Sequence, residues 1–420
     1  MKRFIFITFV FSMFFTLIFS QSDVAKYEKY KLLKREIKEV KERNAIERKF
    51  PFMKVKKFKL PDKKVLTLDF SKIEHPSKVE EFKSVFHFPP IRQWWAGTCW
   101  CYSTISFLES EIYRLHHKKI KLSEQYIVYY EYVEKCRRFF ERKGDSYVDQ
   151  GSESNAVINR MKKYGLVRES DYTGLVPPFK VIDHTPMFKE LKSYLEYVKK
   201  NNFWDVDRNI EYVKSILNKY MGKPPSEIVV DGKKMTPLEF MKNVAGLNPD
   251  DYVDFVSTLK EPFYKQIEFK VPDNWWHDKS YYNIPLSDFY SAILNSIKNG
   301  YSVAIGGDVS EPGYNGFLDI AIVPDFDIPY QYINQSSREF RIYNKTTTDD
   351  HGVHLVGYTH YKGHDWFLIK DSSRTGQRGI PGYLFYRDDY VKLKMLSFMV
   401  HKDAVKSLLE KIKKENSKNK

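Results

Sequence analysis

Residues 93–100 of this 420-residue chain read Gln-Trp-Trp-Ala-Gly-Thr-Cys-Trp, and apolar residues then recur at helical spacing. Gly97 and Thr98 are typical of a turn and an N-cap, which predicts that a helix begins at Cys99. The free N–H groups and the positive dipole end of a helix stabilise a thiolate, the reactive form of cysteine. Gln93 can present a side-chain amide to an oxyanion. The pattern predicts a nucleophilic site, against the alternative that Cys99 is a small buried core residue.

A second block lies far downstream, where residues 349–358 read Asp-Asp-His-Gly-Val-His-Leu-Val-Gly-Tyr and Asp371 ends the next strand-like run. A reactive cysteine needs a base and a group that orients this base. His351 would take the thiol proton and return it to a leaving amine, and Asp371 would orient the ring. The two blocks therefore predict a triad of Cys99, His351 and Asp371, with Gln93 as oxyanion donor.

Together these blocks resemble the papain family of cysteine peptidases (C1), and within it the bleomycin hydrolase and aminopeptidase C branch. The matching residues are Gln93, Gly97, Cys99 and Trp100 in the first block, and His351, Gly352, Val353, Gly357 and Tyr358 in the second. Leu-Ser-Glu-Gln at 122–125 and Asp-Gln-Gly-Ser at 149–152 resemble two further family blocks in the expected order. Residues 107–111 and 306–310 favour the named branch over papain itself.

The resemblance implies an α+β fold of two lobes, in which a helical lobe faces a β-barrel-like lobe. It implies hydrolysis of peptide bonds through a thioester, as an aminopeptidase or an endopeptidase, with peptide or protein substrates and no cofactor. The substrate-binding residues that it implies are Gln150, Gly151, Ser152, Gly352 and Ala304. Gly352 and Ala304 would shape a roomy apolar pocket, or else serve only tight packing. The branch also includes hexamers, which leaves self-association open.

Three departures from the family pattern qualify this interpretation. Ala96 stands where a disulfide-bonded cysteine is usual, Asp371 replaces an asparagine, and Ser373 replaces a tryptophan that shields the histidine's hydrogen bond. These departures motivate the alternative of a degraded homologue that only binds peptides or partners. A Cys-His amidase acting on cell-wall peptide is a third hypothesis, which the block at 122–125 disfavours.

The remaining sequence predicts the domain organisation. Cys99 and His351 are 252 residues apart, against roughly 130–150 in the papain type, which indicates an insert of about a hundred residues. The predicted units are a charged N-terminal extension at 21–85, a peptidase domain at 86–401 and a basic C-terminal tail at 402–420. Within the peptidase domain we expect a helical lobe at about 86–176, a helical insert at about 177–282 and a β-rich lobe at about 283–401. Strand-like runs lie at 301–305, 354–358, 366–369 and 382–386, after a helical pattern at 286–297.

The N-terminus carries the pattern of a targeting segment. Met1-Lys2-Arg3 precedes a largely apolar run at 4–19, which predicts a signal peptide over residues 1–20 that is cleaved between Ser20 and Gln21. An uncleaved membrane anchor is the alternative. We expect an exported protein, periplasmic or secreted, with no membrane span in the mature chain.

Charge, cysteine and histidine patterns exclude several other classes. The formal charge of +15 could indicate nucleic acid, but residues 21–60 hold fourteen basic and six acidic side chains and residues 406–420 hold six and two. The catalytic region is thus nearly neutral, and no nucleic-acid partner is expected. Cys101 and Cys136 are expected as buried free thiols, although an oxidising compartment would allow them to pair. His360 and His364 are expected on a hairpin loop, and no metal site is predicted.

Overall fold

The computed structural model describes residues 25–29, 64–177, 179–316, 318–373 and 382–418. The predicted signal peptide at residues 1–20 lies outside the described residues. The α-helices are α2 (Cys99–His116), α3 (Glu124–Glu141), α4 (Ser154–Tyr164), α5 (Thr185–Lys200), α6 (Val206–Met221), α7 (Pro237–Glu239), α8 (Leu286–Lys298), α9 (Gln335–Tyr343), α10 (Asp388–Lys394) and α11 (Lys406–Lys418). Short 3-10 or π turns are η1 (Phe70–Lys72), η2 (Val79–Glu81), η3 (Phe240–Ala245), η4 (Pro249–Asp251), η5 (Tyr330–Tyr332) and η6 (Lys402–Val405).

The strands are β1 (Ala25–Lys29), β2 (Lys64–Leu68), β3 (Lys83–Ser84), β4 (Ile228–Val230), β5 (Lys233–Met235), β6 (Tyr252–Val256), β7 (Lys265–Ile267), β8 (Tyr281–Asn283), β9 (Val303–Gly307), β10 (Tyr314–Asn315), β11 (Ile320–Ala321), β12 (His351–Tyr361), β13 (His364–Lys370), β14 (Tyr383–Arg387) and β15 (Met395–His401). The four predicted strand-like runs correspond to β9, β12, β13 and β14. The sequence pattern missed β15, because all seven of its residues are buried and they lack the period of two that marks a half-exposed strand.

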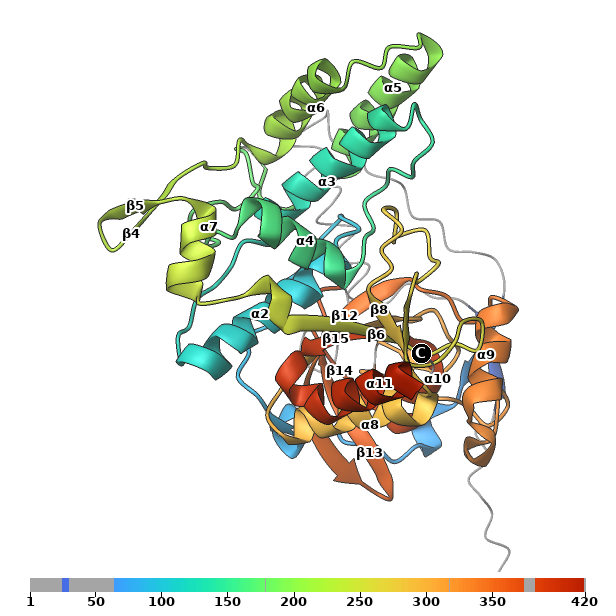
Figure 1. Cartoon of the computed structure of the whole chain (residues 1–420). Helices are drawn as coiled ribbons and strands as arrows, with labels where there is room; N and C mark the ends of the chain where they lie inside the picture. Colours follow the sequence, from blue (N-terminus) through green and yellow to red (C-terminus); the bar gives the residue numbers. More distant parts are fainter. Residues whose placement is uncertain (1–24, 30–63, 178, 317, 374–381, 419–420) are drawn as a thin grey trace, which may run out of the picture.

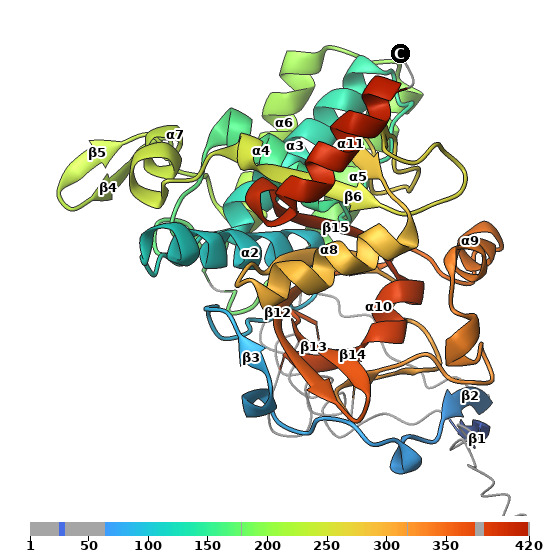
Figure 2. The same ribbon diagram turned by 60° about the horizontal axis from the view of Figure 1, so that its bottom comes forward.

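Helices and sheet segregate into two lobes (Figure 1). One lobe contains α3, α4, α5 and α6, and the other contains the large sheet with α8, α9, α10 and α11 (Figure 2). α2 packs on both, because it contacts α3 and α4 on one side and β9 and β12 on the other. This arrangement confirms the predicted two-lobed α+β fold.

The large sheet has eleven strands in the order β10-β11-β14-β13-β12-β9-β15-β6-β8-β7, and β3 also pairs with β12. β12 and β9 pair from His351 opposite Gly307 to Leu355 opposite Val303. Within the described residues β10 and β7 are the ends of an open sheet, so the predicted barrel-like lobe is not a closed barrel. The reason is that β6, β8 and β7 extend the sheet beyond β15 and do not return to β10.

The segment at 177–282, predicted as a helical insert, contains the helical elements α5, α6, α7 and η3, but it also contributes strands. After α5 and α6 the chain forms the β4–β5 hairpin, and β6, β7 and β8 then join the large sheet. β6 has four buried residues among five and pairs with the wholly buried β15. These short strands are specified by pairing and burial in the sheet, which local residue pattern does not predict.

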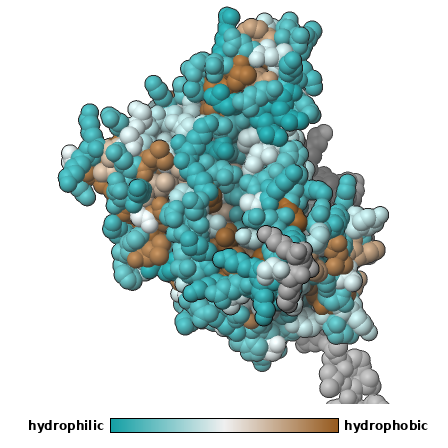
Figure 3. Space-filling model, in the orientation of Figure 1, coloured by the Kyte–Doolittle hydropathy of each residue, from teal (hydrophilic) through white to brown (hydrophobic). Residues whose placement is uncertain are grey.

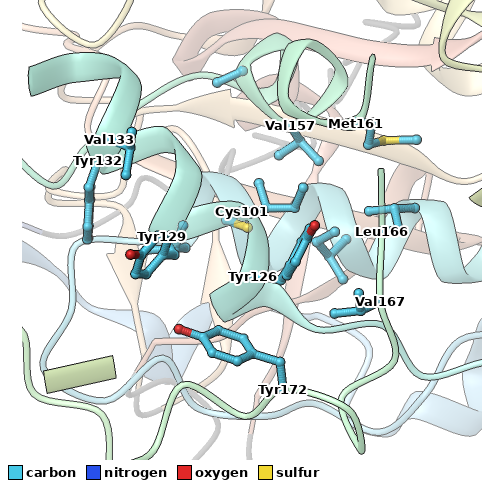
Figure 4. Packing of buried hydrophobic residues seen from close by; sticks show 14 of the residues in the cluster. Cys101, Tyr126, Tyr129, Tyr132, Val133, Val157, Met161, Leu166, Val167 and Tyr172 are labelled. Carbon is cyan, nitrogen blue, oxygen red and sulfur yellow. The ribbon is translucent and has the colours of Figure 1, made fainter. Parts of the chain in front are cut away.

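An aromatic-rich core holds the helical lobe together (Figure 4). The sulfur of Cys101 lies in this core, where its thiol donates a hydrogen bond of 3.3 Å to the carbonyl oxygen of Glu124. Cys101 and Cys136 are both buried and free, as predicted. α2 is buried on more sides than an amphipathic pattern predicts. Its polar residues Ser106 and Glu109 are also buried, and they form hydrogen bonds with His354 and with the backbone N–H of Leu122.

The C-terminal tail is a packed helix. Ile412 of α11 and Val405 of η6 are buried in the same apolar cluster as Phe289 and Ile293 of α8. Lys411 forms a 2.7 Å ion pair with Asp288 at the start of α8. The tail thus covers α8 on the β-rich lobe (Figure 2).

The face of the molecule in Figure 3 is mostly hydrophilic, with small separate apolar patches. No helix among the described residues is long and apolar enough to span a membrane.

Arg338 of α9 joins separate parts of the β-rich lobe from a fully buried position. Its guanidinium donates to four backbone carbonyl oxygens, those of Ser257, Lys392, Met395 and Leu396, at 2.6–3.2 Å. Burial lowers the pKa of Arg338 to about 9. The hydrogen bonds satisfy carbonyl groups that would otherwise be buried without a donor.

We expect Arg338→Met to lower the free energy of unfolding by about 3–5 kcal/mol, because it leaves these carbonyls without donors. Urea unfolding followed by circular dichroism measures the change. The matched control is Lys214→Met, which removes an exposed ion pair with Glu211 and should change the free energy of unfolding far less than Arg338→Met does. Equal losses in both variants would show that Arg338 does not have this role.

Candidate active site

Cys99 is the first residue of α2 and is partly exposed. Thr98 occupies the predicted N-cap position, but its side chain makes no capping hydrogen bond. The backbone carbonyl of Thr98 instead accepts from the N–H groups of Cys101 and Tyr102, at 3.0 and 3.1 Å. The thiol is therefore at a helix N-terminus, where the N–H groups of the first turn favour a negative charge.

His351 and Asp371 are held together beside Cys99. His351 begins β12, and Asp371 directly follows β13, the strand paired with it. The Nε2 atom of His351 lies 2.7 Å from Oδ1 of Asp371, which leaves Nδ1 to face the thiol. Burial opposes a charge on this ring, but the Asp371 carboxylate and the Cys99 sulfur raise the pKa of His351 well above its usual value. This geometry favours an imidazolium beside a thiolate.

Asp371 is shielded from water although the usual tryptophan is absent. Asp371 is 2% exposed, and its Oδ1 also accepts from the backbone N–H of Ser373 at 2.9 Å. The Ser373 hydroxyl donates to Oδ2. Ser373 therefore binds the carboxylate directly, and the carboxylate keeps the orientation that His351 needs.

Gly352 allows β12 to approach the first turn of α2. A Cβ atom at this position would lie 3.3 Å from Cα of Trp100 and 3.0 Å from Oγ of Ser103. Backbone atoms cannot move aside as the end of a long side chain can. Gly352 thus serves close packing between the two lobes, next to His351.

Gln93 is fixed to the segment that follows the triad. Its backbone N–H donates to the carbonyl of Ser372 at 3.0 Å, and its Oε1 accepts from the Ser372 hydroxyl at 2.7 Å. Its Nε2 donates to the carbonyl of Ala96 at 2.7 Å. One N–H of the amide group is used by Ala96, and the second remains for an oxyanion.

The predicted substrate-binding run at 150–152 uses its side chains for support. Oε1 of Gln150 accepts from the N–H of Gly97 at 2.7 Å, and the Gln150 carbonyl accepts from the Trp100 indole at 3.0 Å. The Ser152 hydroxyl donates to Glu131 at 2.6 Å and is buried. The family resemblance implied that the backbone of this run lines the substrate cleft, and the side chains of Gln150 and Ser152 hold the run against the turn before α2 and against α3.

Gly151 lies against Asp273 from the segment between β7 and β8. A Cβ at Gly151 would lie 2.1 Å from Oδ2 of Asp273, so a larger residue at 151 requires the Asp273 side chain to shift. The carbonyl of Gly151 accepts a hydrogen bond from Lys135, a buried residue of α3. Burial lowers the pKa of Lys135.

Ala304 does not line an open pocket. It is completely buried in the core that α2 shares with the sheet, opposite His354 in the β9–β12 pair. Of the two alternatives for this residue, tight packing is the one that the structure supports.

Two sets of supporting residues were missed by the sequence analysis. Glu131 and Lys135 of α3 hold the 149–152 segment, and Trp275 donates to Glu131 at 2.6 Å. The sequence did contain a sign of this role. Glu131 and Lys135 are four residues apart among apolar residues of α3, so both side chains lie on the same, buried face of the helix. In the second set, Ser106 of α2 binds Nδ1 of His354 at 2.9 Å and accepts from Lys370 at 2.8 Å.

His360 and His364, which were considered as metal ligands, face different acidic residues. His360 and His364 flank the β12–β13 hairpin, as predicted, and they face Asp365 and Asp388 respectively. Among the described residues no group of three or more His, Cys, Asp or Glu side chains is arranged to hold a metal ion.

Two family models match consecutive parts of the chain. The model of the papain family cysteine proteases matches residues 84–247, and that of the Peptidase C1-like family matches residues 219–419. Together they span both lobes and the segment between them.

Curated relatives and a solved structure agree with these matches. Aminopeptidase C of Lactobacillus delbrueckii subsp. lactis is 23% identical over 340 residues, which is 70% of this chain and 75% of that protein. Cysteine proteinase 1, mitochondrial, of Saccharomyces cerevisiae is 22% identical over 320 residues, and the chain spans 65% of its length. The crystal structure of PepW from Lactobacillus rhamnosis HN001 superposes with a TM-score of 0.64 at 17% identity, over 92% of this chain and 96% of that one. At this identity the superposition establishes the fold.

We expect Asp371→Asn to lower the pKa of His351, because the neutral amide removes the attraction of a carboxylate for the imidazolium. Titration of the ring by NMR measures the pKa. Asp365→Asn is the matched control, since it removes a carboxylate beside His360 and should leave His351 unchanged. An unchanged pKa of His351 in Asp371→Asn would show that another group stabilises the imidazolium.

Proposed function

This chain belongs to the papain-like (C1) cysteine peptidases, in the bleomycin hydrolase and aminopeptidase C-like branch, and we propose that it is an exported peptidase whose triad is Cys99, His351 and Asp371. The observation that carries this triad is the 2.7 Å contact between His351 and Asp371, with the remaining ring nitrogen directed to a cysteine at a helix N-terminus. The buried, hydrogen-bonded Asp371 supports a working enzyme over a homologue that only binds peptides.

In the proposed acylation step the Cys99 thiolate attacks the carbonyl carbon of a peptide bond. The oxyanion accepts hydrogen bonds from the backbone N–H of Cys99 and from the second N–H of Gln93 Nε2. His351 gives its Nδ1 proton to the leaving nitrogen, the C–N bond breaks and an amine departs. A thioester then joins the acyl group to Cys99.

Deacylation uses the same residues in reverse. Neutral His351 takes a proton from water, the resulting hydroxide attacks the thioester, and the carboxylic acid product leaves as the thiolate forms again. Asp371 holds the ring in one tautomer throughout. Gln93 is bonded to both Ala96 and Ser372, so the oxyanion donor is fixed relative to the triad before substrate binds.

We expect Cys99→Ala to lower kcat/KM on peptide substrates by at least about 10³-fold, because the acyl-enzyme cannot form. A peptidyl epoxide should alkylate Cys99 of the unmodified protein, and mass spectrometry of its peptides locates the label. Cys136→Ala is the control and should retain activity, since Cys136 is buried in α3. Labelling at another residue, or full activity of Cys99→Ala, would contradict the proposed triad.

Export is the second part of the proposal, and it rests on residues 1–20. When the full chain is expressed in a bacterial host, we expect the exported protein to begin at Gln21, because the small Ser20 precedes the predicted cleavage site. N-terminal sequencing and mass determination measure this. Replacing Phe9 and Leu17 with arginine interrupts the apolar run and should retain the uncleaved protein inside the cell. If the wild-type chain also remained uncleaved inside the cell, export would be refuted.

A further inference from the structure

Gln150 is bonded to both sides of the turn that carries Cys99. Its Oε1 accepts from the N–H of Gly97 at 2.7 Å, and its backbone carbonyl accepts from the indole of Trp100 at 3.0 Å. Gly97 and Trp100 lie two residues before and one residue after Cys99. A peptide whose carbonyl carbon is at the Cys99 sulfur therefore passes close to the residue that follows Gln150, which is Gly151.

The backbone carbonyls beside Gly151 are bonded inside the protein. The carbonyl oxygens of Asp149 and Gly151 both accept from the ammonium group of Lys135, the first at 2.9 Å. Lys135 is fully buried in α3, so these two carbonyls are directed into the helical lobe. The N–H of Gly151, by contrast, has no hydrogen-bond acceptor among the residues that the structure describes. At this point the backbone can donate a hydrogen bond to a peptide, while its carbonyls are engaged.

Asp273 places a carboxylate against the same glycine. A Cβ atom on Gly151 would lie 2.1 Å from Oδ2 and 2.6 Å from Oδ1 of Asp273, so the carboxylate contacts the Cα of Gly151. Asp273 is half-buried, and within the described part of the chain its oxygens form neither a hydrogen bond nor an ion pair. Burial raises the pKa of Asp273, and the charge of Lys135 opposes this effect. An acceptor that is not engaged thus lies beside a donor that is not engaged.

The position of Asp273 is fixed by the two residues that follow it. Asn274 is 2% exposed, and its side-chain amide donates to two carbonyls of its own loop at 2.9 and 3.1 Å. The buried Trp275 donates from its indole to Glu131 of α3 at 2.6 Å. Glu131 also accepts from Ser152 at 2.6 Å, so one carboxylate holds both the loop and the cleft backbone. The acceptor is therefore in place before a peptide binds.

We propose that Asp273 is a substrate-binding residue whose carboxylate accepts a hydrogen bond from a backbone nitrogen of the peptide, while the N–H of Gly151 donates to a neighbouring peptide carbonyl. This proposal rests on the proposed peptidase function. Each residue of an extended peptide carries one N–H and one carbonyl, so a donor and an acceptor side by side match its backbone. Asp273 provides the acceptor that the Gly151 carbonyl, bonded to Lys135, does not.

The nitrogen belongs either to an amide inside the peptide or to the free terminal amino group, and a carboxylate binds both. An ester in place of one amide at a time removes the N–H of that amide, and acetylation removes the charge of the terminal amino group. The first test measures kcat/KM for both kinds of modified peptide. We expect one ester position before the cleaved bond, or else acetylation, to lower kcat/KM by about tenfold or more, the effect of losing one hydrogen bond to a charged group.

The same modification should lower kcat/KM of Asp273→Ala by less than about twofold, because the acceptor is already missing. Asp207→Ala removes a carboxylate of α6 whose side chain is 97% exposed, and this matched control should behave as the wild type. A dependence on Asp273 of the ester effect identifies an internal amide, and a dependence of the acetylation effect identifies the terminal amino group. Effects of equal size in the wild type and in Asp273→Ala would overturn the proposal.

Binding to Cys99→Ala provides a measurement that depends neither on catalysis nor on the folding of Asp273→Ala. Fluorescence anisotropy gives the Kd values of labelled amide, ester and acetylated peptides. Equal Kd values, with normal hydrolysis by the wild type, would reject the role of Asp273 and leave the peptidase function intact. A difference of about tenfold that disappears in Cys99→Ala/Asp273→Ala, with no hydrolysis by the wild type, would reject the peptidase function and retain the peptide-binding role of Asp273.

Discussion

The close contact between Gly352 and the first turn of α2 is the constraint on which the rest of the active centre depends. Trp100 lies so near to β12 that a Cβ at Gly352 would be 3.3 Å from its Cα. This approach brings His351, at the start of β12, to the N-terminal end of the helix that carries Cys99. The two reactive residues come from different lobes, so their geometry exists only because the lobes pack directly on each other at this point.

Buried polar contacts maintain this packing around the triad. Lys370 donates to Ser106 of α2, and Ser106 also binds His354 of β12, so helix and sheet share one hydrogen-bonded network. Burial lowers the pKa of Lys370 to about 8. Ser372, the residue after Asp371, donates a hydrogen bond to Gln93. Because buried polar groups are costly when unpaired, separating the lobes would expose or break these bonds, which favours one arrangement of the site.

Sequence reasoning identified the residues that meet at the centre, but it did not predict which way the side chains around them point. Cys99, His351 and Asp371 were recognisable from residue type and order, and the structure brings them together. The side chain of Gln150 binds the turn before Cys99, and Ala304, for which both a pocket and tight packing were open, is in the core. The direction of a side chain depends on neighbours that are far away in sequence, and residue type alone does not predict those neighbours.

Local patterns in the chain were enough to predict several of its helices and four strands of its second half, β9, β12, β13 and β14, because apolar period and turn residues act over a few positions. They were also enough to propose the triad, since a nucleophile, a base and an orienting group carry their chemistry in the residue type. Tertiary structure alone decided that β6, β7 and β8 extend the sheet, and that Ala304 is buried in the core. The reason is physical: strand pairing and burial are set by contacts between distant segments.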